Sequence, residues 1–309
     1  MNVAALAGGV GGARLVDGLA KCLPPDKLTA IVNTGDDFEH LGLKICPDLD
    51  TVCYTLAGLA NPVTGWGRIG ETWNCMETLA QLGEPTWFRL GDRDLATHLK
   101  RTSRMREGYT LSQVTAEFCH SWGVEFKILP VSDDPISTWV YTINEGMLTF
   151  QEYFVHRQCQ PAVRGFRFEG VEHAQPAPGV LGAIQRADLV IICPSNPWVS
   201  IDPILAVPGV RGAVASRKIV AVSPIIGGKT VKGPAAKMCA ELGISPSAFE
   251  IAKHYRALLT GFVFDQVDKD QAVEIVGLGV RGFATNTLMK TDVDRVRLAH
   301  QVLEFGEGL

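Results

Sequence analysis

Two aspartates separated by one residue, Asp48 and Asp50, place two carboxylates where they could bind a cation or accept a proton. They lie in the segment Cys46-Pro47-Asp48-Leu49-Asp50. Carboxylate oxygens are common ligands of Mg²⁺, and a carboxylate within reach of a hydroxyl can act as a general base. A helical stretch over 51–59 follows, so Asp50 is also placed as the N-cap of that helix. Capping alone and a catalytic or metal-binding role both stay open.

A second acidic segment, Asn33-Thr34-Gly35-Asp36-Asp37, ends a buried strand predicted over 28–33. Polar loops at the carboxyl ends of strands are where open α/β sheets bind ligands. A simple Asn/Asp turn would explain the same residues. Adjacent carboxylates beside a phosphate would repel it unless a cation intervenes. We therefore favour a divalent metal near Asp36, or hydrogen bonds from this loop to a base or ribose.

A glycine-rich segment, Gly8-Gly9-Val10-Gly11-Gly12-Ala13-Arg14, lies between a predicted strand over 1–7 and a predicted helix over 15–22. This order places backbone N–H groups and a positive helix end against a phosphate, and glycines let the backbone approach a ligand closely. We predict an anion or nucleotide site here, with a tight packing turn as the alternative. The segment is not a dinucleotide fingerprint, because Arg14 stands where the third glycine belongs. It also lacks the Lys-Ser/Thr of a P-loop.

Two later strands, over 188–193 and 218–222, also end in polar loops. The first leads into Pro194-Ser195-Asn196-Pro197, whose hydroxyl and amide suit a base or ribose. The second leads into Ser223-Pro224-Ile225-Ile226-Gly227-Gly228-Lys229-Thr230, which has serine where a P-loop requires its first glycine. Lys229 and Lys232 could still neutralise phosphate as point charges, or form a solvated pair.

One segment combines aromatic and cationic side chains. Trp87-Phe88-Arg89-Leu90 precedes the acidic turn Gly91-Asp92-Arg93-Asp94. Such a stretch can hold a flat ring and a phosphate, and it can equally form a surface cluster of ion pairs. Both interpretations stay open on these residues alone.

Buried strands that alternate with helices predict an α/β protein with a Rossmann-like, mostly parallel sheet and helices on both faces. The expected strands cover residues 1–7, 28–33, 125–130, 188–193, 218–222, 261–265 and 272–276. Within one domain over 1–309, helices over 71–82, 92–104 and 110–122 form a helical insertion at 65–123, and segments 138–144 and 147–154 form a β-hairpin extension. Right-handed crossovers would bring the loops after residues 7, 33, 193 and 222 to one edge of the sheet.

The composition excludes several classes of protein. The 309 residues carry 29 Lys and Arg against 33 Asp and Glu, and this net charge of −4 argues against general nucleic-acid binding. The eight cysteines form no C-x-x-C motif and indicate free thiols in a reducing cytoplasm. The histidines show no zinc-binding spacing, and no apolar run is long enough for a membrane span. We expect a cytoplasmic protein without a membrane or nucleic-acid partner.

Taken together, these segments resemble the 2-phospho-L-lactate transferase family, CofD. The similarity rests on the glycine-rich segment, the two acidic segments, Gly91-Asp92-Arg93-Asp94, Pro194-Ser195-Asn196-Pro197 and Pro224-Ile225-Ile226-Gly227-Gly228, in this order along essentially the whole chain. It implies a transferase in the biosynthesis of the deazaflavin coenzyme F(420). Such enzymes move the 2-phospholactyl group from lactyl-2-diphospho-5′-guanosine to the ribityl hydroxyl of the deazaflavin Fo, giving F(420)-0 and GMP. They require Mg²⁺ and are commonly homodimers.

The resemblance and the residue pattern together give a set of expected roles. Asp50 is expected to be catalytic. The sites are expected to comprise Asp50, Trp87 and Arg89 for Fo; Gly8, Gly9, Gly11, Gly12, Asn33, Thr34, Ser195, Asn196, Gly228 and Lys229 for the guanosine diphosphate part; and Asp50 with Asp36 for Mg²⁺. One carboxylate can hardly be both a tight metal ligand and a free base, so two of these roles compete. The sequence leaves lactyl and enolpyruvyl donors open.

Two other functions compete with this one. Regulatory proteins that bind nucleotide sugars without known chemistry have a similar glycine loop. The segments around Asp50 and Arg89 favour the transferase, because a regulator needs no acceptor site. A nicotinamide dehydrogenase is disfavoured by the missing third glycine.

Overall fold

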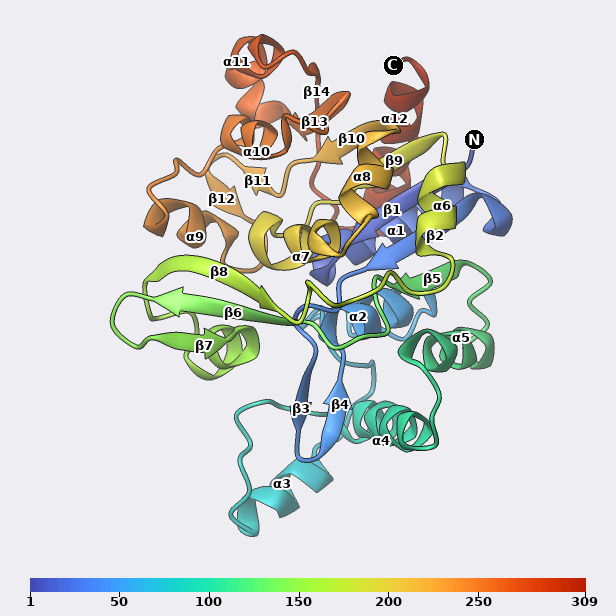
Figure 1. The fold of residues 1–309 in the computed structure, drawn as a ribbon, viewed down its shortest axis with the longest axis vertical. Helices are drawn as coiled ribbons and strands as arrows, with labels where there is room; N and C mark the ends of the chain where they lie inside the picture. Colours follow the sequence, from blue (N-terminus) through green and yellow to red (C-terminus); the bar gives the residue numbers. More distant parts are fainter.

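The computed structural model describes residues 1–309 and is built on a seven-stranded parallel sheet (Figure 1). The strand order is β14-β13-β10-β9-β1-β2-β5, and every neighbouring pair is parallel. The strands are β1 (Val3–Ala7), β2 (Leu28–Val32), β5 (Lys127–Pro130), β9 (Leu189–Ile192), β10 (Lys218–Val222), β13 (Gly261–Asp265) and β14 (Arg281–Thr285). Most are short apolar runs, as expected for strands that are buried on both faces.

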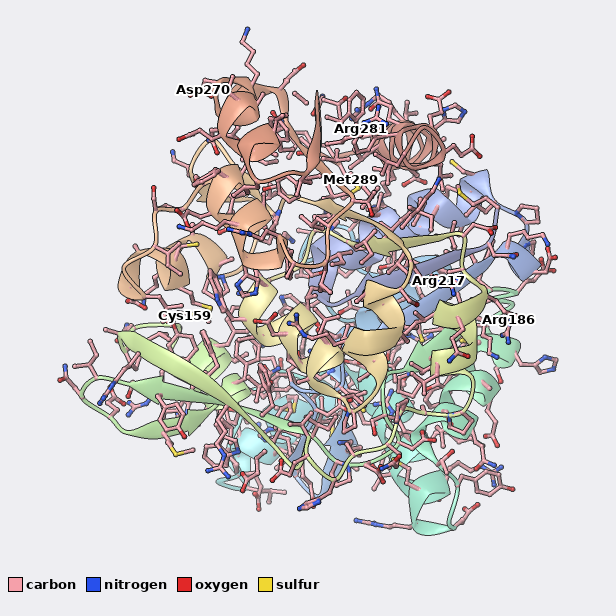
Figure 2. The ribbon with its side chains drawn as sticks, turned by 45° about the horizontal axis from the view of Figure 1, so that its top comes forward. Cys159, Arg186, Arg217, Asp270, Arg281 and Met289 are labelled. Atoms are coloured by element: carbon pink, nitrogen blue, oxygen red, sulfur yellow. The ribbon has the colours of Figure 1, made fainter.

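Helices cover both faces of this sheet, and successive residues of β1 alternate between the two core layers. One layer includes α1 (Gly9–Cys22), α2 (Pro47–Leu56), α5 (Leu111–Ser121) and α12 (Asp292–Glu307). The other includes α6 (Val180–Arg186), α7 (Asp202–Ala206), α8 (Val210–Ala215), α9 (Ala235–Glu241), α10 (Ala248–Tyr255) and α11 (Ala272–Gly277). Charged residues such as Arg186 and Asp270 lie exposed on the outside (Figure 2).

The chain changes direction across the sheet at β1. It passes from β1 to β2 and later β5 on one side, and then returns to place β9, β10, β13 and β14 on the other side. The loops that follow β1 and β9 therefore diverge at their carboxyl ends. Open α/β sheets bind ligands in the crevice at such a switch point.

Two additions surround this edge of the sheet. The insertion contains α3 (Asn74–Gln81), α4 (Asp92–Arg106) and α5, and the hairpin β3 (Phe38–His40) and β4 (Leu43–Ile45) points toward α3 (Figure 1). A three-stranded antiparallel sheet has the order β7 (Met147–Thr149), β6 (Ser137–Thr142) and β8 (Val163–Glu169). The remaining elements are the hairpin β11 (Ile225–Ile226) and β12 (Lys229–Thr230) and the helical turns Pro25–Lys27, Glu152–His156, Pro197–Ile201 and Gln266–Gln271. The predicted α/β class, Rossmann-like sheet, insertion and extension are confirmed.

The last strand of the sheet was predicted in the wrong place. Residues 272–276 form helix α11, and the strand β14 follows it at Arg281–Thr285. The β-branched residues of this segment favour a strand, but Ile275 alone is buried, while Val273 is 82% exposed. Tertiary context overrides local propensity here, because a single buried side chain suits a short surface helix.

Three other boundaries differ from the expectation. Helix α1 begins at Gly9 rather than residue 15, so the glycines form its first turns. Helix α2 begins at Pro47 with Cys46 as N-cap, so Asp50 lies inside its first turn and is not its cap. Proline at the first helical position is favoured because its missing N–H would have no partner there. The segment 147–154 stays extended only to Thr149 and then turns into Glu152–His156.

All eight cysteines are free, as predicted. No helix in the structure combines the length and the hydrophobicity that a membrane crossing requires.

Candidate active site

A cavity of about 740 Å³ opens at the carboxyl edge of the parallel sheet. The loops after residues 7, 33, 193 and 222 all contribute to its lining, as the topology predicts. The opposite wall comes from α2, the insertion and segment 150–158. The cavity therefore joins the glycine-rich segment to the acidic and aromatic residues on the other side.

The glycines at the start of α1 are required by close backbone contacts. Gly9 has a φ of +62°, in the left-handed region that favours glycine. A Cβ atom on Gly11 would lie 2.3 Å from the carbonyl oxygen of Pro194, which real side chains do not tolerate. Gly8 donates its N–H to Ser195 Oγ at 3.1 Å. The glycines thus let the start of α1 lie directly against the loop after β9, at the floor of the cavity.

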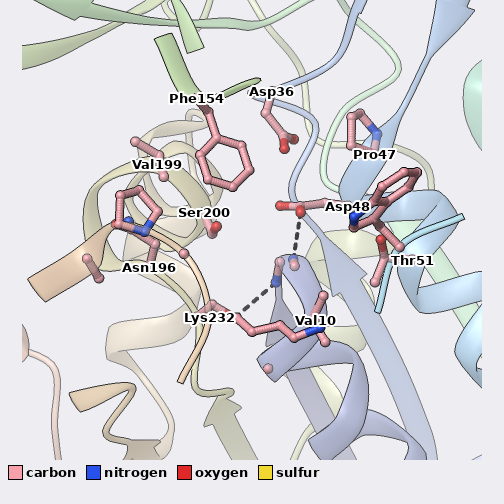
Figure 3. A pocket seen from close by; sticks show the side chains of 18 of the residues that line it. Val10, Asp36, Pro47, Asp48, Thr51, Phe154, Asn196, Val199, Ser200 and Lys232 are labelled. Atoms are coloured by element: carbon pink, nitrogen blue, oxygen red, sulfur yellow. Dashed lines mark hydrogen bonds between the residues drawn. The ribbon is translucent and has the colours of Figure 1, made fainter. Parts of the chain in front are cut away.

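Asp48 and Asp36 face each other across the side chain of Asn33 (Figure 3). Asn33 Nδ2 donates to Asp36 Oδ1 at 3.1 Å, to Asp48 Oδ2 at 3.0 Å and to the carbonyl of Val199 at 3.2 Å. The N–H of Gly9 donates to Asp48 Oδ1 at 2.6 Å. Asn33 itself does not line the cavity, so its observed role is to bring two carboxylates together at the cavity wall.

This arrangement favours a proton or a cation between the two carboxylates. Burial raises the pKa of Asp48 to about 6, although the hydrogen bonds from Asn33 and Gly9 oppose the shift. Burial and the charges of Asp48 and Asp37 also raise the pKa of Asp36. The nearby cation Lys44 pairs with Asp37 at 3.3 Å. The charge of the pair Asp36 and Asp48 is therefore poorly compensated by the protein.

We expect the metal-free protein to lose stability as the pH rises through this pKa. The pKa of the Asp48 carboxyl group is 3.8 in the unfolded state and about 6 in the folded state. Between these two pH values the folded state therefore holds more protons than the unfolded state. Stability should fall by roughly 2–2.5 kcal/mol between pH 4 and pH 7 from this group. Urea unfolding of the wild type and of Asp48→Asn in EDTA measures the difference. A gap between the two proteins that is the same at both pH values would contradict the prediction.

Asp50 points to a different part of the cavity wall. Residues two apart on a helix do not share a face, so the side chains of Asp48 and Asp50 diverge. Asp50 Oδ1 accepts a short hydrogen bond from the Arg101 guanidinium, which is 1% exposed. Burial disfavours the charge of Arg101, but the Asp50 carboxylate outweighs this effect and raises the Arg101 pKa. Asp50 Oδ2 is buried, has no hydrogen-bond partner and belongs to a residue that lines the cavity.

Trp87 and Arg89 also line the cavity. Trp87 stacks on His156 with ring centroids 5.1 Å apart, so the insertion and the segment after β7 meet here. Arg89 lies 4.3 Å from the ring centroid of Trp73 and has no carboxylate partner. An exposed cation among aromatic rings is suited to binding a flat conjugated ligand.

The remaining predicted residues fall into two groups. Ser195 and Asn196 line the cavity, where Asn196 Oδ1 also accepts from the N–H of Trp198. Gly12, Thr34, Gly228 and Lys229 lie outside the lining. Lys232 lines it instead of Lys229, although both are exposed. Lys232 Nζ donates to the carbonyl of Thr64 at 2.6 Å.

Sequence reasoning missed the residues that surround Asp50. Arg101, His98, Asp94 and Tyr54 are buried together beside it. The sequence does show that residues 50 and 54 share one helix face, and that residues 94, 98 and 101 share another, since residues three or four apart lie on the same face of a helix. Without the pairing of α2 with α4, that signal could not be connected to Asp50.

The fold and the cavity define a Rossmann-like α/β protein whose candidate ligand site lies at the switch point of its sheet. Residues 3–297 match the family described as 2-phospho-L-lactate transferase CofD. The chain belongs to this family of transferases, as the sequence resemblance predicted.

Individual relatives agree with this assignment. The chain is 45% identical over 315 residues to the phosphoenolpyruvate transferase of Streptomyces griseus subsp. griseus, covering 99% of both. It is 45% identical over 294 residues to the phosphoenolpyruvate transferase of Thermobifida fusca, covering 91% of both. A crystal structure of a protein member of the UPF0052 family from Bacillus halodurans superposes with a TM-score of 0.64 over 98% of both chains. At 17% identity, that likeness shows the fold alone.

Proposed function

We propose that this protein transfers a phosphorylated three-carbon acid from a guanosine-diphosphate-linked donor to the terminal ribityl hydroxyl of the deazaflavin Fo, and releases GMP. Membership of the CofD family supports the transferase class. The observation that carries the proposal is one continuous cavity with the glycine-rich start of α1 on one wall and Asp50 on another. Donor phosphates and an acceptor hydroxyl need such facing walls.

The acid on the donor was predicted to be lactyl, with enolpyruvyl as the open alternative. The relatives that are about 45% identical are named phosphoenolpyruvate transferase. That name favours the enolpyruvyl donor for this chain. The two acids share a three-carbon skeleton and differ only in the saturation of one carbon–carbon bond, and the diphosphate and guanosine are common to both, so the same cavity walls serve either donor.

In the proposed reaction, the ribityl hydroxyl oxygen forms a bond to the phosphorus that bears the acid, while the bond from that phosphorus to the GMP oxygen breaks. Asp50 accepts the hydroxyl proton, because it lines the cavity and one of its carboxylate oxygens, Oδ2, has no hydrogen-bond partner. The start of α1 and Lys232 bind the donor phosphates. Such a transfer depends on positioning and charge neutralisation more than on covalent chemistry by the protein.

Mg²⁺ is part of this proposal, and the pair Asp36 and Asp48 fits it better than the predicted pair Asp50 and Asp36. Asp50 Oδ1 is already paired with Arg101, whereas Asp36 and Asp48 are held together with their charge poorly compensated. No group of three His, Cys, Asp or Glu side chains is arranged to hold a metal. This agrees with Mg²⁺, which commonly takes one or two carboxylates and completes its shell with water and substrate phosphates. When bound, the ion would neutralise the charge of the donor phosphates.

We expect Arg89→Ala to weaken Fo binding about five- to tenfold, because a cation over a conjugated ring contributes on the order of 1 kcal/mol. Quenching of Fo fluorescence during a titration measures the dissociation constant directly. Arg167→Ala is the matched control, since Arg167 is exposed on β8 and outside the cavity. Equal affinities of Arg89→Ala and the wild type would remove Arg89 from the acceptor site.

The same titration separates the transferase from a nucleotide-sugar-binding regulator. A transferase binds Fo, whereas a regulator would bind UDP-sugars and leave Fo fluorescence unchanged. The aromatic wall at Trp87 and the free Asp50 oxygen favour the transferase, because a regulator has no use for them. A homodimer and a cytoplasmic location remain predictions, which gel filtration with light scattering and cell fractionation test.

A further inference from the structure

The contact between α2 and α4 contains a chain of buried polar side chains. Asp50 and Tyr54 lie one turn apart on α2, and Asp94, His98 and Arg101 share one face of α4. All five are at most 8% exposed, and all except Arg101 also belong to the lining of the cavity. Burying this many ionisable groups gives little net stability, since apolar residues of similar size often do as well or better. The arrangement therefore calls for a functional reason.

The contacts run in sequence away from Asp50. Arg101 donates through Nη2 to Asp50 Oδ1 and lies with Nη1 3.1 Å from His98 Nδ1. His98 Nε2 lies 3.4 Å from Asp94 Oδ1, which also accepts from the Tyr54 hydroxyl at 2.7 Å. Because a guanidinium only donates, His98 Nδ1 accepts and the ring proton is on Nε2, facing Asp94. His98 thus holds Nη1 of the Arg101 guanidinium in place while Nη2 binds Asp50.

This series of contacts leaves one carboxylate oxygen of Asp50 without a hydrogen-bond partner. Both Nη groups of Arg101 are occupied, one at Asp50 Oδ1 and the other at His98 and the carbonyl of Lys44. Asp50 Oδ2 lies 3.7 Å from His98 Nδ1, beyond a hydrogen bond. The guanidinium therefore binds the carboxylate through Oδ1 only, and Oδ2 is buried without a hydrogen-bond partner on a residue that lines the cavity.

The same helix α4 is joined to the acceptor wall. It begins at Asp92, three residues after Arg89. Its first turn is held by the Glu71 carboxylate, which accepts from the N–H groups of Arg93 at 2.7 Å and Asp94 at 3.0 Å. The position of α4 is therefore linked both to the segment that carries Arg89 and to the carboxylate of Asp50.

We propose that His98 is a positioning residue: through Arg101 it fixes the orientation of Asp50 at the cavity wall that the acceptor hydroxyl would face, and it couples that orientation to α4. The inference rests on the proposed function. A carboxylate displaced by about 1 Å from the reacting hydroxyl can cost roughly 10²-fold in rate without loss of substrate binding.

Two substitutions of His98 test this inference. His98→Leu removes both ring nitrogens, and His98→Asn keeps an acceptor near the position of Nδ1. With Fo and donor, we expect His98→Leu to lower kcat roughly 10²-fold, with both KM values nearly unchanged. His98→Asn should recover most of the loss. Crystal structures should show Asp50 rotated in the leucine variant and retained in the asparagine variant. Tyr54→Phe, which deletes only the hydroxyl, is the milder variant should His98→Leu fail to fold, and it should lower kcat with KM unchanged.

The inference is overturned by an unchanged Asp50 orientation in the folded His98→Leu crystal, by a kcat close to that of the wild type, or by equal losses in the Leu and Asn variants. If the wild type transfers nothing, the proposed function fails. The orientation of Asp50 in the two crystals still decides the role of His98 in that case.

Discussion

Asp50→Asn is expected to lower kcat for transfer to Fo by about 10²–10⁴-fold, the usual contribution of a general base. The asparagine oxygen still accepts from Arg101, but the amide that replaces the unpaired Oδ2 cannot take a proton. Substrate binding should change little, because the phosphates and the deazaflavin contact other walls of the cavity.

Steady-state kinetics with Fo, donor and Mg²⁺ measures this effect, with the fold of the variant checked by urea unfolding. Asp270→Asn is a matched control, because Asp270 is exposed on the outside of the molecule (Figure 2) and does not line the cavity. A turnover of Asp50→Asn that equals that of the control would remove Asp50 from the chemistry.

Arg101→Met is expected to have the largest effect on stability, a loss of about 3–5 kcal/mol in the free energy of unfolding. Methionine approximates the volume of the arginine stem but leaves the buried Asp50 carboxylate without its cation. The cost arises from the unpaired charge rather than from lost packing. Removing that charge as well should therefore restore part of the stability.

Urea unfolding of Arg101→Met, Asp50→Asn and the double variant tests this coupling. The double variant should be more stable than Arg101→Met alone. Arg186→Met, an exposed site at the end of α6, should change stability by less than about 0.5 kcal/mol. Additive losses in the double variant would show that Arg101 and Asp50 do not depend on each other.

Much of the framework could be predicted because its signals are local. Apolar runs marked most strands of the parallel sheet, and the glycine-rich segment marked the strand-to-helix connection after β1, although α1 begins earlier than predicted. Since parallel strands deliver their carboxyl ends to one edge, the meeting of the loops after residues 7, 33, 193 and 222 followed from topology alone. The expected place of Asp50 in the site came from the family resemblance, and Asp50 does line the cavity.

The pairing of side chains across the cavity could not be predicted, because it depends on contacts distant in sequence. Adjacent numbering suggested that Asp48 and Asp50 act together, yet the helix turns them to different walls, and Asn33 joins Asp48 to Asp36 instead. The cation beside Asp50 is Arg101, fifty-one residues away in the sequence. The strand predicted over residues 272–276 was wrong for a related reason. The β-branched side chains of this segment favour a strand, but most of them are exposed on helix α11 instead of buried in the sheet.

The central claim is tested most directly by incubating the purified chain with Fo, Mg²⁺ and either lactyl- or enolpyruvyl-diphosphoguanosine, and following Fo and GMP by liquid chromatography and mass spectrometry. We expect that Fo gains one phosphorylated three-carbon acid as one GMP is released, and that the transfer is faster with the enolpyruvyl donor. Unchanged Fo with both donors, under conditions in which the protein binds them, would contradict it.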